Sequence, residues 1–202
     1  MTQVKGVIEY HGLSDWWQNE ITTAEKEIIL TTYNPMGSSP NEIIEANICF
    51  SSGSAVQLVG SIASWLNKIE HIELAKKLFV KAENLINSRT PILDVHFLFQ
   101  NEIITYYKHR EVIGLEASIT SCNKQISISK KASRILISEY GMPLPSHKGY
   151  QQLSIIMEKL SDYQKVIAIC NEAKNEGWSG DWDKRIERCT KKQIKLLDKI
   201  CK

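Results

Sequence analysis

The sequence lacks paired cysteines that would indicate disulfide bonds, and it lacks long apolar segments that would anchor the chain in a membrane. Its five cysteines are scattered and form no C-x-x-C pair, which argues against a disulfide framework and for reduced thiols. No stretch approaches the roughly 18 uncharged apolar residues of a membrane-spanning helix, and the first residues lack the apolar core of a signal peptide. These absences predict a cytoplasmic protein without a membrane partner.

Signals for β-hairpins are also missing, because no Asn-Gly or Asp-Gly dipeptide lies between alternating runs. Neither sign of charge is in large excess, because 25 basic and 23 acidic residues give a net charge of +2. The overall charge therefore does not attract the whole chain to nucleic acid. Apolar residues, by contrast, make up 43% of the 202 positions, enough for the core of one globular domain. The 27 isoleucines suggest an AT-rich genome and hence a bacterial or phage source.

From residue 54 onward, apolar residues recur in steps of three and four, the spacing of one helix face. The segment 54–68 shows this with Ala55, Leu58, Val59, Ile62, Ala63 and Leu66. The same rhythm continues in 72–86, 150–160 and 163–173. Isoleucine alone would favour strands, but the periodicity indicates helices, and we predict an all-α chain of successive helix pairs.

Capping signals indicate where these helices begin. Thr22 and Glu25 have the spacing of a capping box. The Thr90-Pro91 dipeptide predicts a helix from 92 to about 109, because proline is favoured at the first helical position. Further N-caps are predicted at Ser39, Ser54, Ser146, Asp162 and Asp181. Residues 1–53 are less regular, and we expect one or two short helices, loops and a candidate strand at 48–50.

Two helix pairs share one spacing of apolar and small residues, with offsets 0, 3, 4, 7, 16, 20 and 23. The first set is Val59, Ile62, Ala63, Leu66, Ala75, Phe79 and Ala82; the last is Tyr150, Leu153, Ser154, Met157, Val166, Cys170 and Ala173. A looser middle set, with a turn two residues longer, is Gln100, Ile103, Ile104, Tyr107, Ser118, Cys122 and Gln125. The small residues allow close helix contact, and the larger ones fill the space between pairs. We therefore expect Ala75, Ala173, Cys122 and Cys170 to be buried.

This offset pattern resembles the tetratricopeptide repeat, whose signature W-x2-L-G-x2-Y is followed by A-x3-F and a closing proline. The stretch 150–175, with Tyr163-Gln164-Lys165-Val166 opening its second helix, is the most similar. The resemblance covers 54–87 and 146–177, and 92–127 loosely. The leading tryptophan, the glycine and the closing proline are absent, and 128–145 is interpreted as an insertion. Similar repeats occur in many bacterial proteins of unassigned function.

The resemblance implies an irregular tetratricopeptide-like α-solenoid that is one domain. Residues 1–53 would pack on the array as an N-terminal segment, 54–177 would form three helix pairs, and 178–202 would be a capping helix. The first helix of each pair would line a concave surface. The residues expected to turn into this groove are Gln57, Ser64, Asn67, Lys68, Asn101, Thr105, Lys108, Lys148, Gln151, Glu158 and Lys159.

Amides and lysines of this kind suit a peptide backbone or a carboxylate. The sequence thus predicts a non-catalytic protein–protein or protein–peptide interaction module, with no cofactor, metal or catalytic residue and with nucleic acid not the expected partner. Two alternatives stay open: a sensor that holds a small ligand or peptide in its groove, and an enzyme whose site residues converge only in three dimensions.

Three further motifs allow more than one interpretation. The loop Ser51-Ser52-Gly53-Ser54 predicts a helix N-cap, with an anion cradle as the alternative. Trp16 and Trp17 predict an anchor for the N-terminal segment, at least one of them turned away from the helix core, with an exposed hot spot for a partner as the alternative.

The C-terminal helix is the third of these motifs. Residues 183–202 hold eight basic and three acidic residues, which predicts a solvated outer face, with a strip for an acidic partner or a phosphate backbone as the alternative. The apolar face would hold Ile186, Cys189, Gln193, Leu197 and Ile200, and the opposite, basic face Lys184, Arg188, Lys191, Lys195, Lys199 and Lys202.

Overall fold

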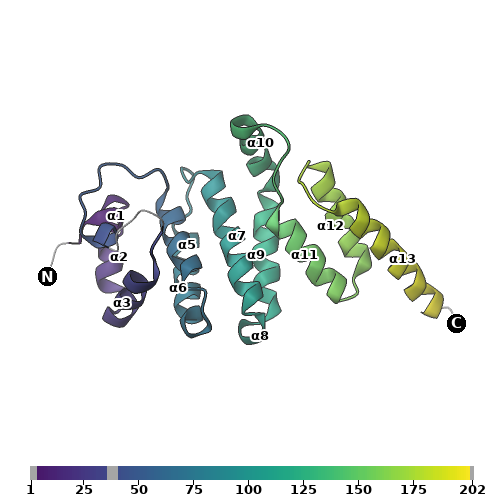
Figure 1. Cartoon of the computed structure of the whole chain (residues 1–202), viewed down its shortest axis with the longest axis horizontal. Coiled ribbons are helices and arrows are strands. Elements are labelled where there is room, and N and C mark those ends of the chain that lie inside the picture. The colour runs from purple at the N-terminus through teal and green to yellow at the C-terminus, as the bar shows by residue number, and fades with distance from the viewer. Residues whose placement is uncertain (1–3, 36–40, 201–202) are drawn as a thin grey trace. The chain divides into compact units, whose positions relative to one another are not determined.

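The computed structural model describes residues 4–35 and 41–200, except for the side chains of 41 and 197–200. Within this part of the chain all regular elements are helices, as predicted, and the candidate strand at 48–50 is absent. The chain divides into two compact units, residues 1–101 and 102–202, whose helices are labelled in Figure 1. The solenoid arrangement and the single domain stay predictions. No helix among the described residues has the length and apolar character needed to cross a bilayer.

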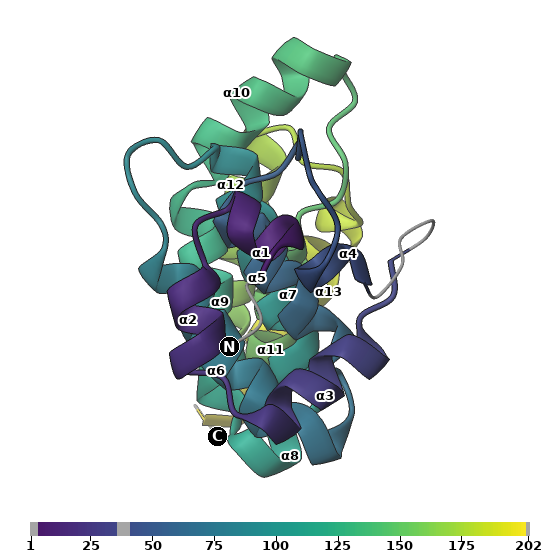
Figure 2. The same cartoon turned by 90° about the vertical axis from the view of Figure 1, so that its left-hand side faces the viewer.

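The first unit combines four short helices with a longer helix pair. Its elements are α1 (Gly6–Tyr10), α2 (Ser14–Asn19), α3 (Thr23–Thr32), α4 (Asn41–Ile44), α5 (Ala55–Trp65), the 3-10 turn η1 (Ile69–His71), α6 (Ile72–Asn84) and the first part of α7 (Ile92–Lys108). Figure 2 shows the short helices grouped on one side of α5 and α6. The predicted capping box at Thr22 and the N-cap at Ser54 are confirmed, whereas Ser39 lies outside the described residues.

The tandem tryptophans belong to the core of the first unit. Trp16 and Trp17 are only 4% and 3% exposed, and the ammonium of Lys81 on α6 lies 5.5 Å from the centre of the Trp16 ring. The expectation that one of them turns outward was therefore wrong, and so was the alternative of an exposed hot spot. The pair anchors α2 because both rings are removed from water.

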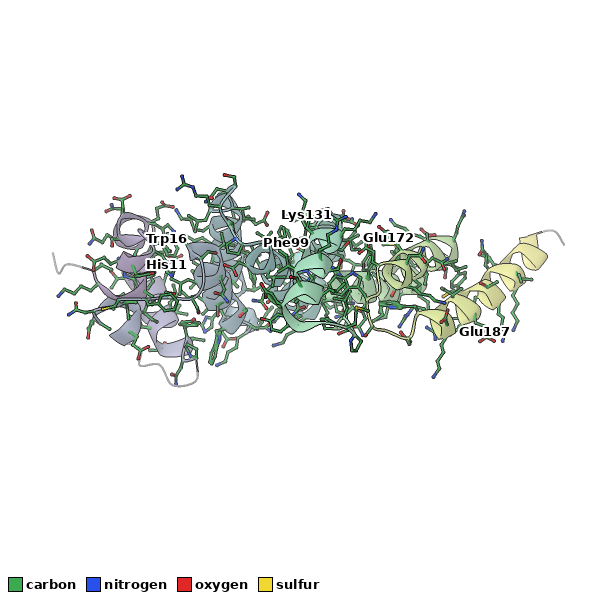
Figure 3. All side chains as sticks on the ribbon, turned by 90° about the horizontal axis from the view of Figure 1, so that it is seen from above. His11, Trp16, Phe99, Lys131, Glu172 and Glu187 are labelled. Carbon is green, nitrogen blue, oxygen red and sulfur yellow. The ribbon has the colours of Figure 1, made fainter. Side chains whose placement is uncertain are left out.

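The second unit is built from the end of α7 and six further helices. These are α8 (Arg110–Ile113), α9 (Leu115–Ser127), α10 (Ser129–Tyr140), α11 (Lys148–Lys159), α12 (Tyr163–Asn175) and α13 (Trp182–Ile200). Helix α11 packs on α9 and α12, and α12 packs on α13. The interpreted insertion 128–145 contains α10, which packs on α9 and carries the exposed Lys131 (Figure 3).

Aromatic packing fixes the start of α11 and the turn before α13. His147, not the predicted Ser146, is the N-cap of α11, and its Nδ1 accepts the N–H of Tyr150 at 3.3 Å. The His147 ring lies between Tyr150 and Trp178, with ring centres 4.7 and 4.6 Å away. Trp182 donates its indole N–H to the Trp178 carbonyl. The predicted N-cap at Asp162 is confirmed.

Two alanines of the helix-pair spacing are buried, as predicted. Ala75 on α6 and Ala173 on α12 have no exposed surface. We expect Ala75→Leu and Ala173→Leu each to lower the free energy of unfolding by about 1–3 kcal/mol, since a larger side chain overpacks a filled core. Thermal melting followed by circular dichroism measures this, with Ala168→Leu at an exposed position of α12 as control. Unchanged melting of both variants would contradict the spacing.

Candidate functional site

The residues predicted to line a groove are placed differently in the two units. In the first unit Gln57 and Lys68 are exposed and Ser64, Asn67 and Asn101 are half-buried. Gln57 and Asn101 come together at a cavity of about 130 Å³ that Asp94 also lines.

In the second unit Lys108 and Lys159 are exposed and Lys148, Gln151 and Glu158 are half-buried. Thr105 is only 1% exposed, so the expectation that it turns outward was wrong. In the structure Thr105 shares the buried face of α7 with Glu102 and His109, which are three residues before and four residues after it. The loose spacing of the predicted middle pair did not identify this face.

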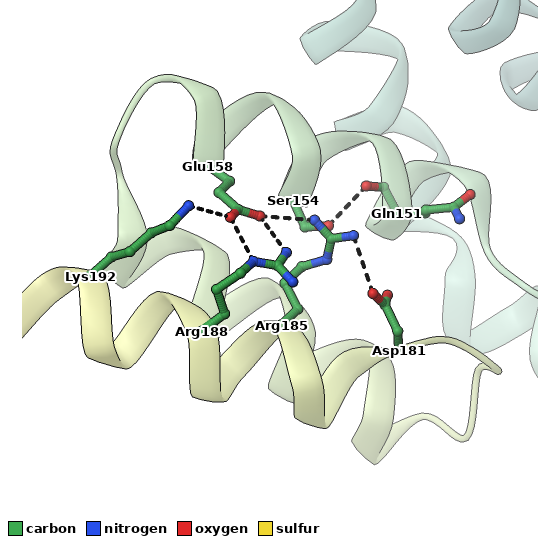
Figure 4. Close-up of polar contacts among 7 residues, drawn as sticks. All are labelled: Gln151, Ser154, Glu158, Asp181, Arg185, Arg188 and Lys192. Carbon is green, nitrogen blue, oxygen red and sulfur yellow. Dashed lines mark hydrogen bonds and ion pairs between the residues drawn. The ribbon is translucent and has the colours of Figure 1, made fainter.

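Glu158 of α11 is the centre of a charged cluster that joins α11 to α13 (Figure 4). Its carboxylate accepts hydrogen bonds from Arg188 at 2.8 and 2.9 Å, from Lys192 at 2.9 Å and from Arg185 at 3.1 Å. Arg185 also lies 3.6 Å from Asp181. Three cations thus share one carboxylate, whose side chain is only 14% exposed.

The surrounding cations determine the ionisation of this carboxyl. Hydrogen bonds from Arg188 lower the pKa of Glu158 to about 2, with Lys192 acting in the same direction, although partial burial opposes them. In return, the hydrogen bond to Glu158 raises the pKa of Arg188 and of Lys192. Glu158, Arg188 and Lys192 therefore stay charged at neutral pH. Arg188 was expected on the solvated face of the last helix, and its contact with α11 corrects that expectation.

A surface rich in basic side chains extends from this cluster along α13. We call it the cationic face; it consists of Lys159, Lys184, Arg188, Lys191, Lys192 and Lys195. Three shallow hollows of about 340, 200 and 290 Å³ lie along it. Lys192 lines all three, so the hollows adjoin one another.

Some of these cations already have hydrogen-bond or ion-pair partners in the chain. Glu187, which is exposed on α13 (Figure 3), pairs with Lys191 at 2.6 Å. Lys159 donates to the Tyr107 hydroxyl at 2.9 Å. Lys184 and Lys195 have no ion-pair partner in the part of the chain that the structure describes. The cationic face therefore keeps a net positive charge.

Apolar side chains are interspersed with these cations. Ile155 lines one hollow together with Lys159 and Lys192. In another, the Lys192 ammonium lies 5.7 Å from the Tyr163 ring centre, beside Leu196, which is 44% exposed. Such a mixture can bind a segment that carries both carboxylates and apolar groups. Lys199 and Lys202, which were expected to continue the strip, and the apolar Leu197 and Ile200 lie outside the described side chains.

The cysteines and the loop 51–54, which the sequence offered as other candidate sites, are engaged in packing or hydrogen bonding within the fold. Cys122 and Cys170 are buried as predicted, and burial raises the pKa of their thiols to about 12 and about 11. Among the described residues no group of three or more His, Cys, Asp or Glu side chains could hold a metal ion. The predicted cap at Ser54 occupies the start of α5, and the Ser54 N–H donates to Asp94 Oδ2 at 3.0 Å. The Asp94 carboxylate thus occupies the position where an anion would bind if the loop were an anion cradle.

Comparison of the chain with protein-family models, curated proteins and solved structures finds no match.

Proposed function

We propose that the chain is a non-catalytic interaction module that binds an acidic segment of another protein on the cationic face. The observation that carries this proposal is the convergence of exposed lysines around hollows that also contain apolar side chains. The proposal keeps the predicted class of function and the groove residues Glu158 and Lys159. It adds α13, whose basic residues were predicted from the sequence to form only a solvated outer face.

The organisation of the cationic face favours an extended acidic peptide. Glu158 fixes Arg188 and Lys192 in position, so these side chains lose little freedom when a ligand binds. Lys184 and Lys195 lie on the same helix and provide cations that have no ion-pair partner among the described side chains. Ile155, Tyr163 and Leu196 offer apolar contact between these charges. Charge complementarity of this kind accelerates association and excludes basic partners.

Nucleic acid is the weaker candidate because the apolar side chains of Ile155 and Leu196 are interspersed with the cations. A phosphate backbone offers these side chains no apolar contact, whereas an acidic peptide that also carries apolar residues does. Glu187 in the largest hollow pairs with Lys191, and it would repel a phosphate and a peptide carboxylate alike. The tetratricopeptide-like array remains our proposal for the scaffold that displays this face.

We expect the triple variant Lys184→Glu, Lys191→Glu, Lys195→Glu to bind an acidic model peptide at least about tenfold more weakly than the unchanged chain. The probe is a fluorescent peptide of alternating Glu and Leu residues, and fluorescence anisotropy at low salt measures its affinity. Melting should hardly change, because exposed charges contribute little to stability.

The matched control reverses the same amount of charge elsewhere in the second unit. Lys130, Lys131 and Arg134 are exposed on α10 and outside the cationic face, so their change to Glu should leave the affinity nearly intact. Equal losses in both triple variants would indicate only net-charge attraction and overturn the proposal. Tighter binding of a single-stranded oligonucleotide than of the peptide would overturn it in favour of nucleic acid.

A further inference from the structure

A cavity of about 290 Å³ lies in the first unit, at the lower end of the size range of ligand sites. Its walls come from α1, α4, the residues after α3, the loop 51–54 and the start of α5. Gly6 brings two of these walls together: it has φ +68°, and its N–H donates to the Ala46 carbonyl at 2.9 Å. A Cβ at residue 6 would collide with the backbone of Glu42 and Ile43, so only glycine allows this approach of α1 to α4.

The polar groups of the cavity are mostly hydrogen-bond acceptors or hydroxyls. His11 (Figure 3) lies with Nε2 3.1 Å from the Ser51 hydroxyl. The Tyr33 hydroxyl donates to Ser61 at 3.5 Å. Gln57 folds its carboxamide over the loop, and its Oε1 occupies the space that a Cβ at Gly53 would need. Glu42 adds a half-buried carboxylate.

The charge of this lining is negative. Among the described residues that line the cavity, Glu42 is the only acidic residue, and none is a lysine or an arginine. Partial burial lowers the pKa of His11, so its imidazole is neutral at physiological pH. Asp94 of α7 accepts the Ser54 N–H at the start of α5, so it adds a second carboxylate next to the loop 51–54. The site therefore repels anions and favours a cation.

The pairing of His11 with Ser51 also resembles a base and a nucleophile, yet the same charges weigh against acyl transfer. A serine nucleophile needs donors that stabilise a developing oxyanion. Here the Ser54 N–H, the natural donor at the start of α5, is taken by Asp94, and Glu42 adds negative charge. The histidine and the hydroxyl are better placed to accept hydrogen bonds from a bound cation.

We propose that this cavity binds a small ligand with a protonated amino group, such as a short aliphatic diamine or amino alcohol, with Glu42 as its counter-ion. An ammonium group has three donors and no acceptor, which matches a lining of carboxylate, carboxamide and hydroxyl oxygens. Val7, Ile43 and Leu58 contribute apolar walls for the short carbon chain. This site is independent of the cationic face, because it belongs to the first unit and prefers the opposite charge.

The test is isothermal titration of the full chain with diaminobutane and, separately, with butanediol, which has the same length but no charge. We expect the diamine to bind and the diol to bind at least about tenfold more weakly. Glu42→Gln should weaken diamine binding by a similar factor. Glu45→Gln removes the same charge from an exposed neighbour that does not line the cavity, and it should leave binding unchanged.

A second variant reports on the cavity without changing charge. Gly53→Ala displaces the Gln57 carboxamide and should also weaken binding, while circular dichroism verifies that the helices persist. Equal affinity for diamine and diol, equal effects of the two glutamate variants, or no heat with the diamine at millimolar concentration would each overturn the proposal. Tighter binding of inorganic phosphate than of the diamine would do the same.

Discussion

The Glu158→Gln variant is expected to lose about 3 kcal/mol of stability, because three cations would lose their shared carboxylate. Arg185 contributes most of this cost. Its side chain is 11% exposed, so the guanidinium would keep only Asp181, at 3.6 Å, as an acidic partner among the described residues. Chemical unfolding followed by circular dichroism measures the difference.

The same variant should change the response to acid. The pKa of Glu158 is lowered to about 2 in the folded chain from an ordinary value of 4.5. Its contribution to stability is therefore complete above about pH 4.5 and is lost as the pH falls towards 2. Unfolding measured between pH 5 and pH 2 should show a shallower loss of stability in Glu158→Gln than in the unchanged chain.

Two further variants separate this cluster from ordinary surface charge. Glu187→Gln removes an exposed ion pair on α13 and should leave stability almost unchanged. The double variant Glu158→Leu, Arg185→Met removes both buried partners and should recover part of the stability that Glu158→Gln loses. If Glu187→Gln were as costly as Glu158→Gln, the cluster would not be what joins α11 to α13.

The Phe79→Ala variant is expected to lose about 3–5 kcal/mol, the largest effect of any change considered for the first unit. The Phe79 side chain has no exposed surface and lies between Ala75 and Ala82 in the series on the packed face of α6. Its truncation leaves a cavity that these short side chains cannot fill. Thermal and denaturant unfolding both report the loss.

The matched control is Phe50→Ala, because Phe50 is 78% exposed. That change should alter the free energy of unfolding by no more than about 0.5 kcal/mol. Similar losses for the two phenylalanines would mean that α6 does not present the face predicted from the spacing of Ala75, Phe79 and Ala82.

Local chemistry explains why much of the helical structure could be predicted from the sequence. The capping residues Thr22, Ser54 and Asp162 act within three residues of themselves, so their signal is contained in a short segment. Proline at 91 likewise indicated the start of α7. At the start of α11 the sequence predicted Ser146, because serine is a preferred cap, but the structure has His147 there, where its ring packs against Tyr150 and Trp178.

The candidate sites were harder to predict because they depend on contacts between distant segments. Arg185, Arg188 and Lys192 are spaced three and four residues apart, which places them on one helix face. That spacing could have indicated a cationic stripe facing α11, but nothing local identifies Glu158 as its partner. Similarly, His11 and Ser51 meet across 40 positions, a contact without any periodic signal.

The cysteines of the chain can serve as native probes of local unfolding, because they differ in how far they are buried. Cys49 is exposed, so an alkylating reagent can reach it in the intact fold. Cys170 on α12 and Cys189 on α13 have no exposed surface, and both become accessible when α13 separates from α12. Cys122 lies where α9 meets the start of α11. Its alkylation therefore requires these two helices to separate. The order in which these positions are alkylated, read by mass spectrometry, would thus reveal which helix detaches first.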